Sequence, residues 1–171
     1  MHPTMHKLEP PDTHHFSAAT GWLELGLPAE ARAELARITP ALQDQPDVLE
    51  LRWMVAAEEK QWEEGLRIAQ ALIRWAPKRS SGWLHQAYAL RRVPEGGLEK
   101  AWEALLPAAD KFPKEPIILY NLSCYACQMQ KLDTARLWLK RATTIGGVKK
   151  IKHMSMQDPD LEPLWPAIGA L

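Results

Sequence analysis

The chain has 171 residues, of which 46% are hydrophobic, enough for one ordinary domain or one short repeat array with a buried core. Its 21 Lys and Arg balance 21 Asp and Glu, and this zero formal charge argues against a dedicated nucleic-acid binder. The apolar stretches are shorter than the roughly 20 residues that cross a bilayer, and the first residues lack the apolar run of a secretory signal. We therefore expect a cytoplasmic protein with no membrane partner.

The charges are unevenly distributed along the chain. Residues 1–64 carry 12 acids and 5 bases, a net of minus seven, whereas residues 65–171 carry 9 acids and 16 bases, a net of plus seven. The sequence thus predicts oppositely charged ends, which would permit self-association from head to tail.

Helical spacing dominates the chain, because Ala, Leu, Glu, Arg and Gln fill long windows and strand alternation is scarce. Residues 1–12, rich in Pro and His, are expected to form a flexible leader. Asp12 or Thr13 is then expected to cap the first helix, and Gly26 to end it in a left-handed turn. Pro28 suits the first turn of the second helix, where its missing amide is harmless.

Further helix starts recur along the chain. Asp47 and Glu50 predict a variant of the capping box, and Ser80 or Ser81 is expected to cap the fifth helix. Pro116 suits the first turn of the seventh helix. The punctuation predicts eight helices of roughly 11 to 15 residues, the usual length in a helical hairpin.

A period appears in the second helix of each predicted pair. Small residues recur at spacings of 34, 36 and 34, at Ala31, Gly65, Ala101 and Ala135. Apolar or small residues follow four and seven positions later, at Leu35, Ala69, Leu105 and Leu139, and at Ile38, Leu72, Ala108 and Ala142. This period indicates stacked hairpins, since one hairpin cannot bury its apolar stripe alone.

The periodic pattern resembles the tetratricopeptide repeat (TPR) family, most closely in the unit YNLSCYACQMQKLDTARLWLKRA. The resemblance implies an all-α, right-handed superhelical stack of about four helix-turn-helix repeats, over residues 13–46, 47–80, 81–114 and 115–145. Trp53 departs from the family, because it stands where a small residue is usual. Trp53 and Trp75 are also candidates for exposed anchors that bind a partner.

Residues 146–171 are expected to form a C-terminal capping helix and tail. Gly146 and Gly147 break the eighth helix, and residues 148–156 can form one more amphipathic helix over the open end of the stack. The tail has a helix start at Asp158 or Asp160, and it is expected to dock onto the last repeat through Leu161, Leu164 and Trp165.

Few residues point to catalysis. No Ser, His and carboxylate set has a recognisable nucleophile context, so we expect no enzyme, no cofactor and no metal. Cys124 and Cys127 form a C-x-x-C inside a predicted helix, where packing is the expected role. A thiol or metal protein that uses this pair is one alternative.

The family resemblance implies a protein–protein interaction module that acts as an adaptor, scaffold or chaperone-like subunit. In that family the first helix of each repeat lines a concave groove, which would bind a peptide or helix of another protein. The residues implied here are Leu51, Met54, Leu84, His85, Tyr88, Arg91, Tyr120 and Asn121. Arg91 would engage a carboxylate of the partner.

A second alternative rests on the basic C-terminal end. Residues 136–153 contain no acid, and their basic side chains could meet RNA or another polyanion. Aromatic residues suited to stacking on bases are not interleaved with these charges, so we do not expect a nucleic-acid partner. The basic side chains are Arg136, Lys140, Arg141, Lys149, Lys150 and Lys152.

Overall fold

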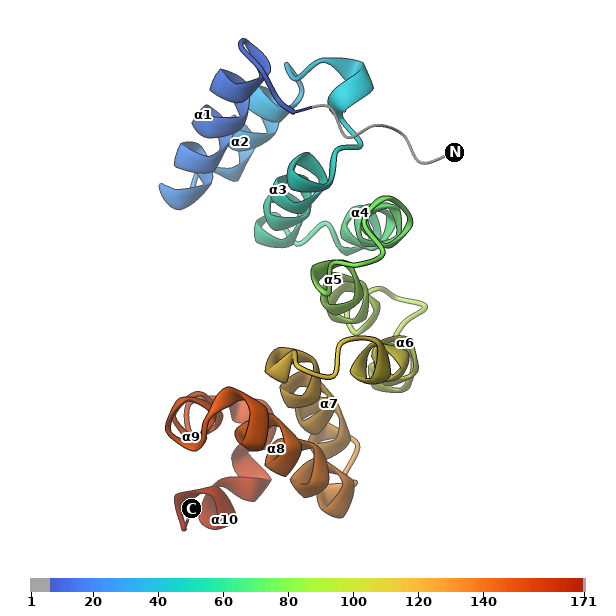
Figure 1. The fold of residues 1–171 in the computed structure, drawn as a ribbon, viewed down its shortest axis with the longest axis vertical. Coiled ribbons are helices and arrows are strands. Elements are labelled where there is room, and N and C mark those ends of the chain that lie inside the picture. The colour runs from blue at the N-terminus through green and yellow to red at the C-terminus, as the bar shows by residue number, and fades with distance from the viewer. Residues whose placement is uncertain (1–6, 171) are drawn as a thin grey trace. The chain divides into compact units, whose positions relative to one another are not determined.

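A computed structural model describes residues 7–170, which form ten α-helices and two short 3₁₀ segments and contain no strand (Figure 1). The all-helical fold predicted from the sequence is confirmed. Residues 1–6 of the predicted leader lie outside the described residues. The α-helices are α1 (Asp12–Glu24), α2 (Pro28–Leu35), α3 (Pro46–Glu58), α4 (Trp62–Trp75), α5 (Ser81–Leu90), α6 (Leu98–Lys111), α7 (Pro116–Gln128), α8 (Leu132–Gly146), α9 (Val148–Ser155) and α10 (Trp165–Gly169), and the 3₁₀ segments are η1 (Pro40–Leu42) and η2 (Pro159–Leu164).

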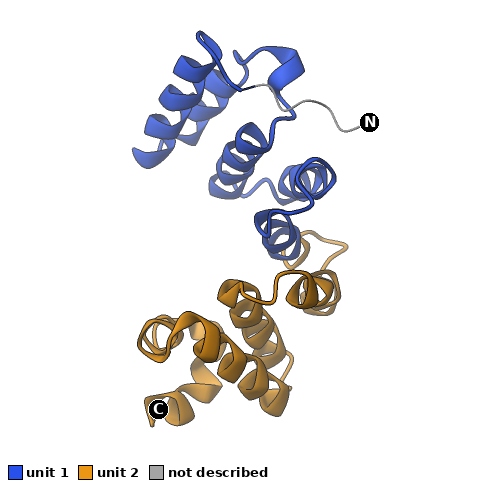
Figure 2. Ribbon diagram, viewed as in Figure 1, with its two compact units in different colours: residues 1–89 blue, residues 90–171 orange. Residues whose placement is uncertain are grey.

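The chain divides into two compact units, residues 1–89 and residues 90–171 (Figure 2). This boundary falls inside the third repeat expected from the sequence, residues 81–114. The division into four repeats therefore stays a prediction.

In unit 1, α1 packs on α2, α3 packs on α4, and α2 also contacts α3. The small and apolar residues of the period lie in its core: Ala31, Leu35, Ile38, Ala69 and Leu72 are all buried. The small side chains among them, Ala31 and Ala69, let neighbouring helix backbones approach closely, which is why small residues repeat at this spacing.

Trp53 is buried in unit 1, so the interpretation of this residue as an exposed anchor is wrong, whereas Trp75 is 41% exposed. Gly65 on α4 lies beside the Trp53 indole: a Cβ built there would lie 3.5 Å from Trp53 Nε1, at ordinary contact distance, and leaves no room for a larger side chain. A bulky residue on α3 is thus matched by the absence of one on α4.

In unit 2, α7 packs against α6, α8 and η2, and α9 follows α8. The tail lies against α7: η2 contacts that helix, Leu161 and Leu164 of η2 are buried, and the Trp165 indole donates to the Ser155 carbonyl of α9 at 2.8 Å. The helix expected over residues 148–156 is α9. Asp158 caps the segment, since its carboxylate accepts from the Asp160 amide.

Before η2, the helix starts agree with the sequence at prolines and differ from it at acids. Pro28 and Pro116 begin α2 and α7 as expected, and Gly26 has the left-handed φ of 72°. Asp12 makes no cap: its carboxylate accepts from the Thr39 amide at 2.6 Å and ties the start of α1 to the chain after α2.

Asp47 and Glu50 also make no capping box, because α3 begins at Pro46 with no side-chain cap and both carboxylates bind the Arg79 guanidinium instead. The Arg79 guanidinium reaches both carboxylates and binds them in place of the local backbone amides. Within residues 7–170, no helix has the length and apolar content that crossing a bilayer requires.

Candidate protein-binding groove

A groove of about 620 Å³ runs between α1 and α3 of unit 1. Its lining follows helical spacing on both sides, so that one stripe of α1 faces one stripe of α3. The lining residues are Phe16, Thr20, Leu23 and Glu24 of α1, and Asp47, Glu50, Leu51, Trp53, Met54, Ala57 and Glu58 of α3.

The apolar part of the groove is accessible from outside. The Met54 side chain is 48% exposed, although it is flanked in the lining by the buried Leu51 and Trp53. A half-exposed Met offers a flexible, polarisable contact surface for a partner side chain. Two of the residues that the sequence placed in a groove, Leu51 and Met54, therefore do line one.

Aromatic rings of α5 extend the surface from Trp53. The imidazole of His85 stacks on the Trp53 ring at 3.7 Å with an interplanar angle of 9°, and Tyr88 meets Trp53 edge-on at 5.9 Å. Burial lowers the pKa of His85 to about 4, which keeps the ring neutral near pH 7. Tyr88 is 39% exposed, so this cluster presents one aromatic face to solvent.

Carboxylates surround the apolar lining, and among residues 7–170 no Lys or Arg lines the groove. Asp47 and Glu50 share the Arg79 guanidinium at one place on the rim. Glu24 and Glu58 are exposed and make no hydrogen bond or ion pair with residues 7–170. The groove is therefore apolar at its floor and negative at its rim.

The remaining predicted groove residues have partners within the chain or are partly covered. Leu84 of α5 is partly buried. In unit 2, Arg91 donates two hydrogen bonds to the Asp160 carboxylate, the second at 2.9 Å. The Tyr120 hydroxyl donates to Asp158 at 2.8 Å, and the Asn121 amide donates to the Ile117 carbonyl. The tail thus supplies the carboxylate that we expected from a partner.

The α1 side of the groove was missed from the sequence. The signal was present as an apolar stripe at positions 16, 20 and 23, in which Phe16 and Leu23 flank Thr20. The resemblance to the repeat family placed no residue of this first helix in the groove.

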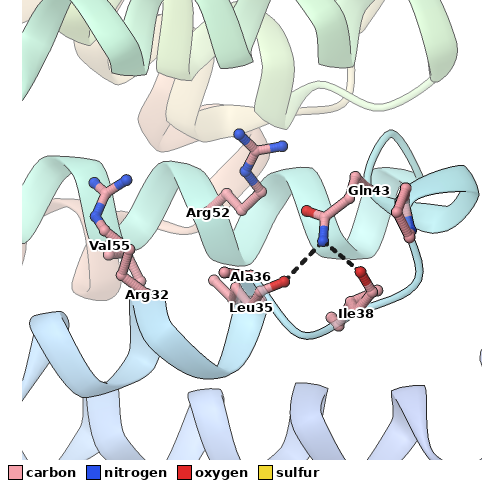
Figure 3. Close-up of a pocket in the computed structure, with 8 residues that line it drawn as sticks. Arg32, Leu35, Ala36, Ile38, Gln43, Arg52 and Val55 are labelled. Carbon is pink, nitrogen blue, oxygen red and sulfur yellow. Dashed lines mark hydrogen bonds between the residues drawn. The ribbon is translucent and has the colours of Figure 1, made fainter.

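A second hollow, of about 370 Å³, lies between α2 and α3 (Figure 3). Gln43 donates from its amide to the carbonyls of Leu35 and Ile38, both at 2.8 Å. Arg32 binds two carboxylates, Glu59 at 2.6 Å and Glu64 at 2.9 Å. Gln43 and Arg32 are thus already paired within unit 1, whereas Arg52, which also lines the hollow, makes no hydrogen bond or ion pair with residues 7–170.

The two cysteines are buried free thiols of α7. Burial raises the pKa of Cys124 and the pKa of Cys127, which disfavours the reactive thiolate. In residues 7–170, no group of three or more His, Cys, Asp or Glu side chains gathers as metal ligands would. The thiol and metal alternative gains no support from this geometry.

Comparison with known proteins supports the fold. No family model matches the sequence, and no curated protein does. The solved structure of the MamA RS-1 ArsTM double mutant has a TM-score of 0.67 and 16% identity, covering 81% of this chain and 77% of that one. MamA 41-end from Desulfovibrio magneticus RS-1 has a TM-score of 0.49 and 18% identity, covering 82% of this chain and 97% of that one. The first likeness shows an all-helical fold like that of MamA, a TPR-like helical repeat.

Proposed function

We propose that the protein is a non-enzymatic scaffold that binds a segment of another protein in the groove between α1 and α3. The observation that carries this proposal is the apolar lining around Met54, which is open to solvent between two helices of unit 1. A helical-repeat fold supports the same use, since stacked hairpins commonly present such surfaces to peptides.

The proposal uses only part of the groove that the sequence implied. Leu51, Met54, His85 and Tyr88 belong to unit 1 and lie on or beside the groove. Arg91 and Tyr120 are assigned to holding the tail instead, because their polar atoms already bind Asp160 and Asp158. A cytoplasmic location is part of the proposal.

The basic end has a weaker case as a polyanion site. Arg136 pairs with Asp133 at 2.8 Å, the Arg141 guanidinium lies over Trp138, and Lys152 donates to the Gly169 carbonyl. Three of its cations therefore already have neighbours within unit 2. The exposed Lys140, Lys149 and Lys150 are compatible with an ordinary solvated surface.

A pull-down that compares two matched substitutions tests the proposed groove. Met54→Asp places a charge in the groove, and Leu137→Asp places the same charge on α8, where Leu137 is 60% exposed. Both positions are exposed, so neither change should unfold the protein. We expect proteins captured by the wild type to be retained by Leu137→Asp and lost by Met54→Asp. Equal retention by the two variants would remove the groove from the function.

A further inference from the structure

The two free carboxylates of the groove lie at helix ends. Glu24 is the last residue of α1, and Glu58 is the last residue of α3. Both side chains line the groove, so the C-terminal ends of the two helices come to the same surface. A helix C-terminus carries a partial negative charge, which adds to the field of the two carboxylates.

The rim stays negative where its carboxylates are paired. One cation, Arg79, serves both Asp47 and Glu50 at 2.7 and 3.2 Å. The Ser81 hydroxyl also donates to Glu50 at 2.8 Å, but it brings no charge. Of the four carboxylates that line the groove, two thus share a single positive charge and two have none.

We infer that the groove selects a cationic amphipathic segment of another protein, an inference that rests on the proposed function. Apolar side chains of the segment would cover Phe16, Leu23 and Met54, while its Lys or Arg side chains would reach Glu24 and Glu58. Charge complementarity of this kind gives specificity and fast association more than affinity. An acidic segment would place like charges against the rim and is therefore rejected.

Peptide titration with the full chain tests this inference. The probes are three fluorescein-labelled peptides of about 14 residues: an amphipathic one with Leu at helical spacing and Lys elsewhere, its Glu-for-Lys counterpart, and a Lys and Leu peptide scrambled to lack an apolar face. The variant is Glu24→Lys/Glu58→Lys. Its control is Glu99→Lys/Glu103→Lys, which makes the same charge change at exposed positions of α6 in unit 2.

We expect the amphipathic Lys peptide to bind most tightly, and its affinity to fall about tenfold in Glu24→Lys/Glu58→Lys at low salt. The control variant should stay within about twofold of the wild type. Binding of the Glu peptide at equal strength, or equal losses in the variant and the control, would overturn the selection by charge. So would the absence of any binding of the amphipathic Lys peptide.

Two further measurements separate this inference from the proposed function. If Met54→Gln, which removes the apolar contact without adding a charge, abolishes binding of every peptide while Glu24→Lys/Glu58→Lys has no effect on binding, the groove stands and its cationic selectivity fails. If Met54→Gln leaves binding of the Lys peptide unchanged, both fail. Self-association of the wild type in sedimentation that is lost in Glu24→Lys/Glu58→Lys would make a second copy the occupant, and would overturn the assignment to another protein.

Discussion

The contact between Arg91 and Asp160 locks the tail onto unit 2, and removing it should destabilise the protein measurably. The guanidinium donates twice to one carboxylate, and the side chains are only 23% and 25% exposed. Hydrogen bonds to charged groups contribute about 1.5–3 kcal/mol, and partial solvent screening places this pair near the lower part of that range. Arg91→Ala should therefore cost about 2 kcal/mol, or about 4–8 °C in Tm for a chain of this size.

Urea denaturation of four proteins would test this value: the wild type, Arg91→Ala, Asp160→Ala and the double variant. A double-mutant cycle isolates the energy of the pair from other effects of each substitution. Arg136→Ala is the control, since its ion pair with Asp133 is largely exposed and should contribute nothing measurable. An Arg91→Ala variant as stable as Arg136→Ala, or a coupling energy near zero, would refute the assignment of Arg91 to the tail.

Four further outcomes are expected. Gly65→Ala should stabilise the protein by about 0.5–1 kcal/mol in urea denaturation, because the new Cβ fits at ordinary contact distance from Trp53. Gly65→Leu should instead cost about 1–3 kcal/mol. Loss of stability in Gly65→Ala would contradict the packing described. The pKa of His85, about 4, lies below its ordinary value of 6.5, so the unfolded state protonates first and the free energy of unfolding falls as pH drops from about 6.5 towards 4. His85→Phe should remove this part of the pH dependence. Equal pH profiles of stability for the wild type and His85→Phe would contradict this prediction. Ala135→Leu should lower Tm through a cost of about 1–3 kcal/mol, and an unchanged Tm would remove this fully buried position from the helix packing. A thiol reagent should label Cys124 and Cys127 slowly until the chain unfolds, and rapid labelling of the folded protein would contradict their burial.

The period of small residues was readable from the sequence because it reflects helix packing directly. Ala31, Ala101 and Ala135 are fully buried, and the apolar residue four positions after each is buried too. Pro28 and Pro116 were informative too, since a proline's fixed φ and missing amide suit the first helical turn, although Pro107 lies inside α6. The spacing of small residues and the place of prolines both depend on local helix geometry, so a sequence pattern can predict them.

The pairing of charged groups was not readable in the same way. Arg91 and Asp160 are 69 residues apart, and both were noticed separately, one as a groove residue and the other as a possible helix start. Asp12 was likewise expected to cap its own helix, but it binds Thr39 across 27 residues. Each of these Asp carboxylates had possible hydrogen-bond donors both nearby and far away in the sequence. The tertiary fold decides which donor it binds.

The most direct test of the central claim is photo-crosslinking from the groove itself. A photoreactive phenylalanine analogue would replace Met54 in one protein and the exposed Leu137 of α8 in another, and both would be irradiated in lysate. We expect a discrete crosslink to another polypeptide from position 54, suppressed by an excess of the amphipathic Lys peptide, and none of that product from position 137. The same product from both positions, or none from position 54, would contradict a binding site between α1 and α3.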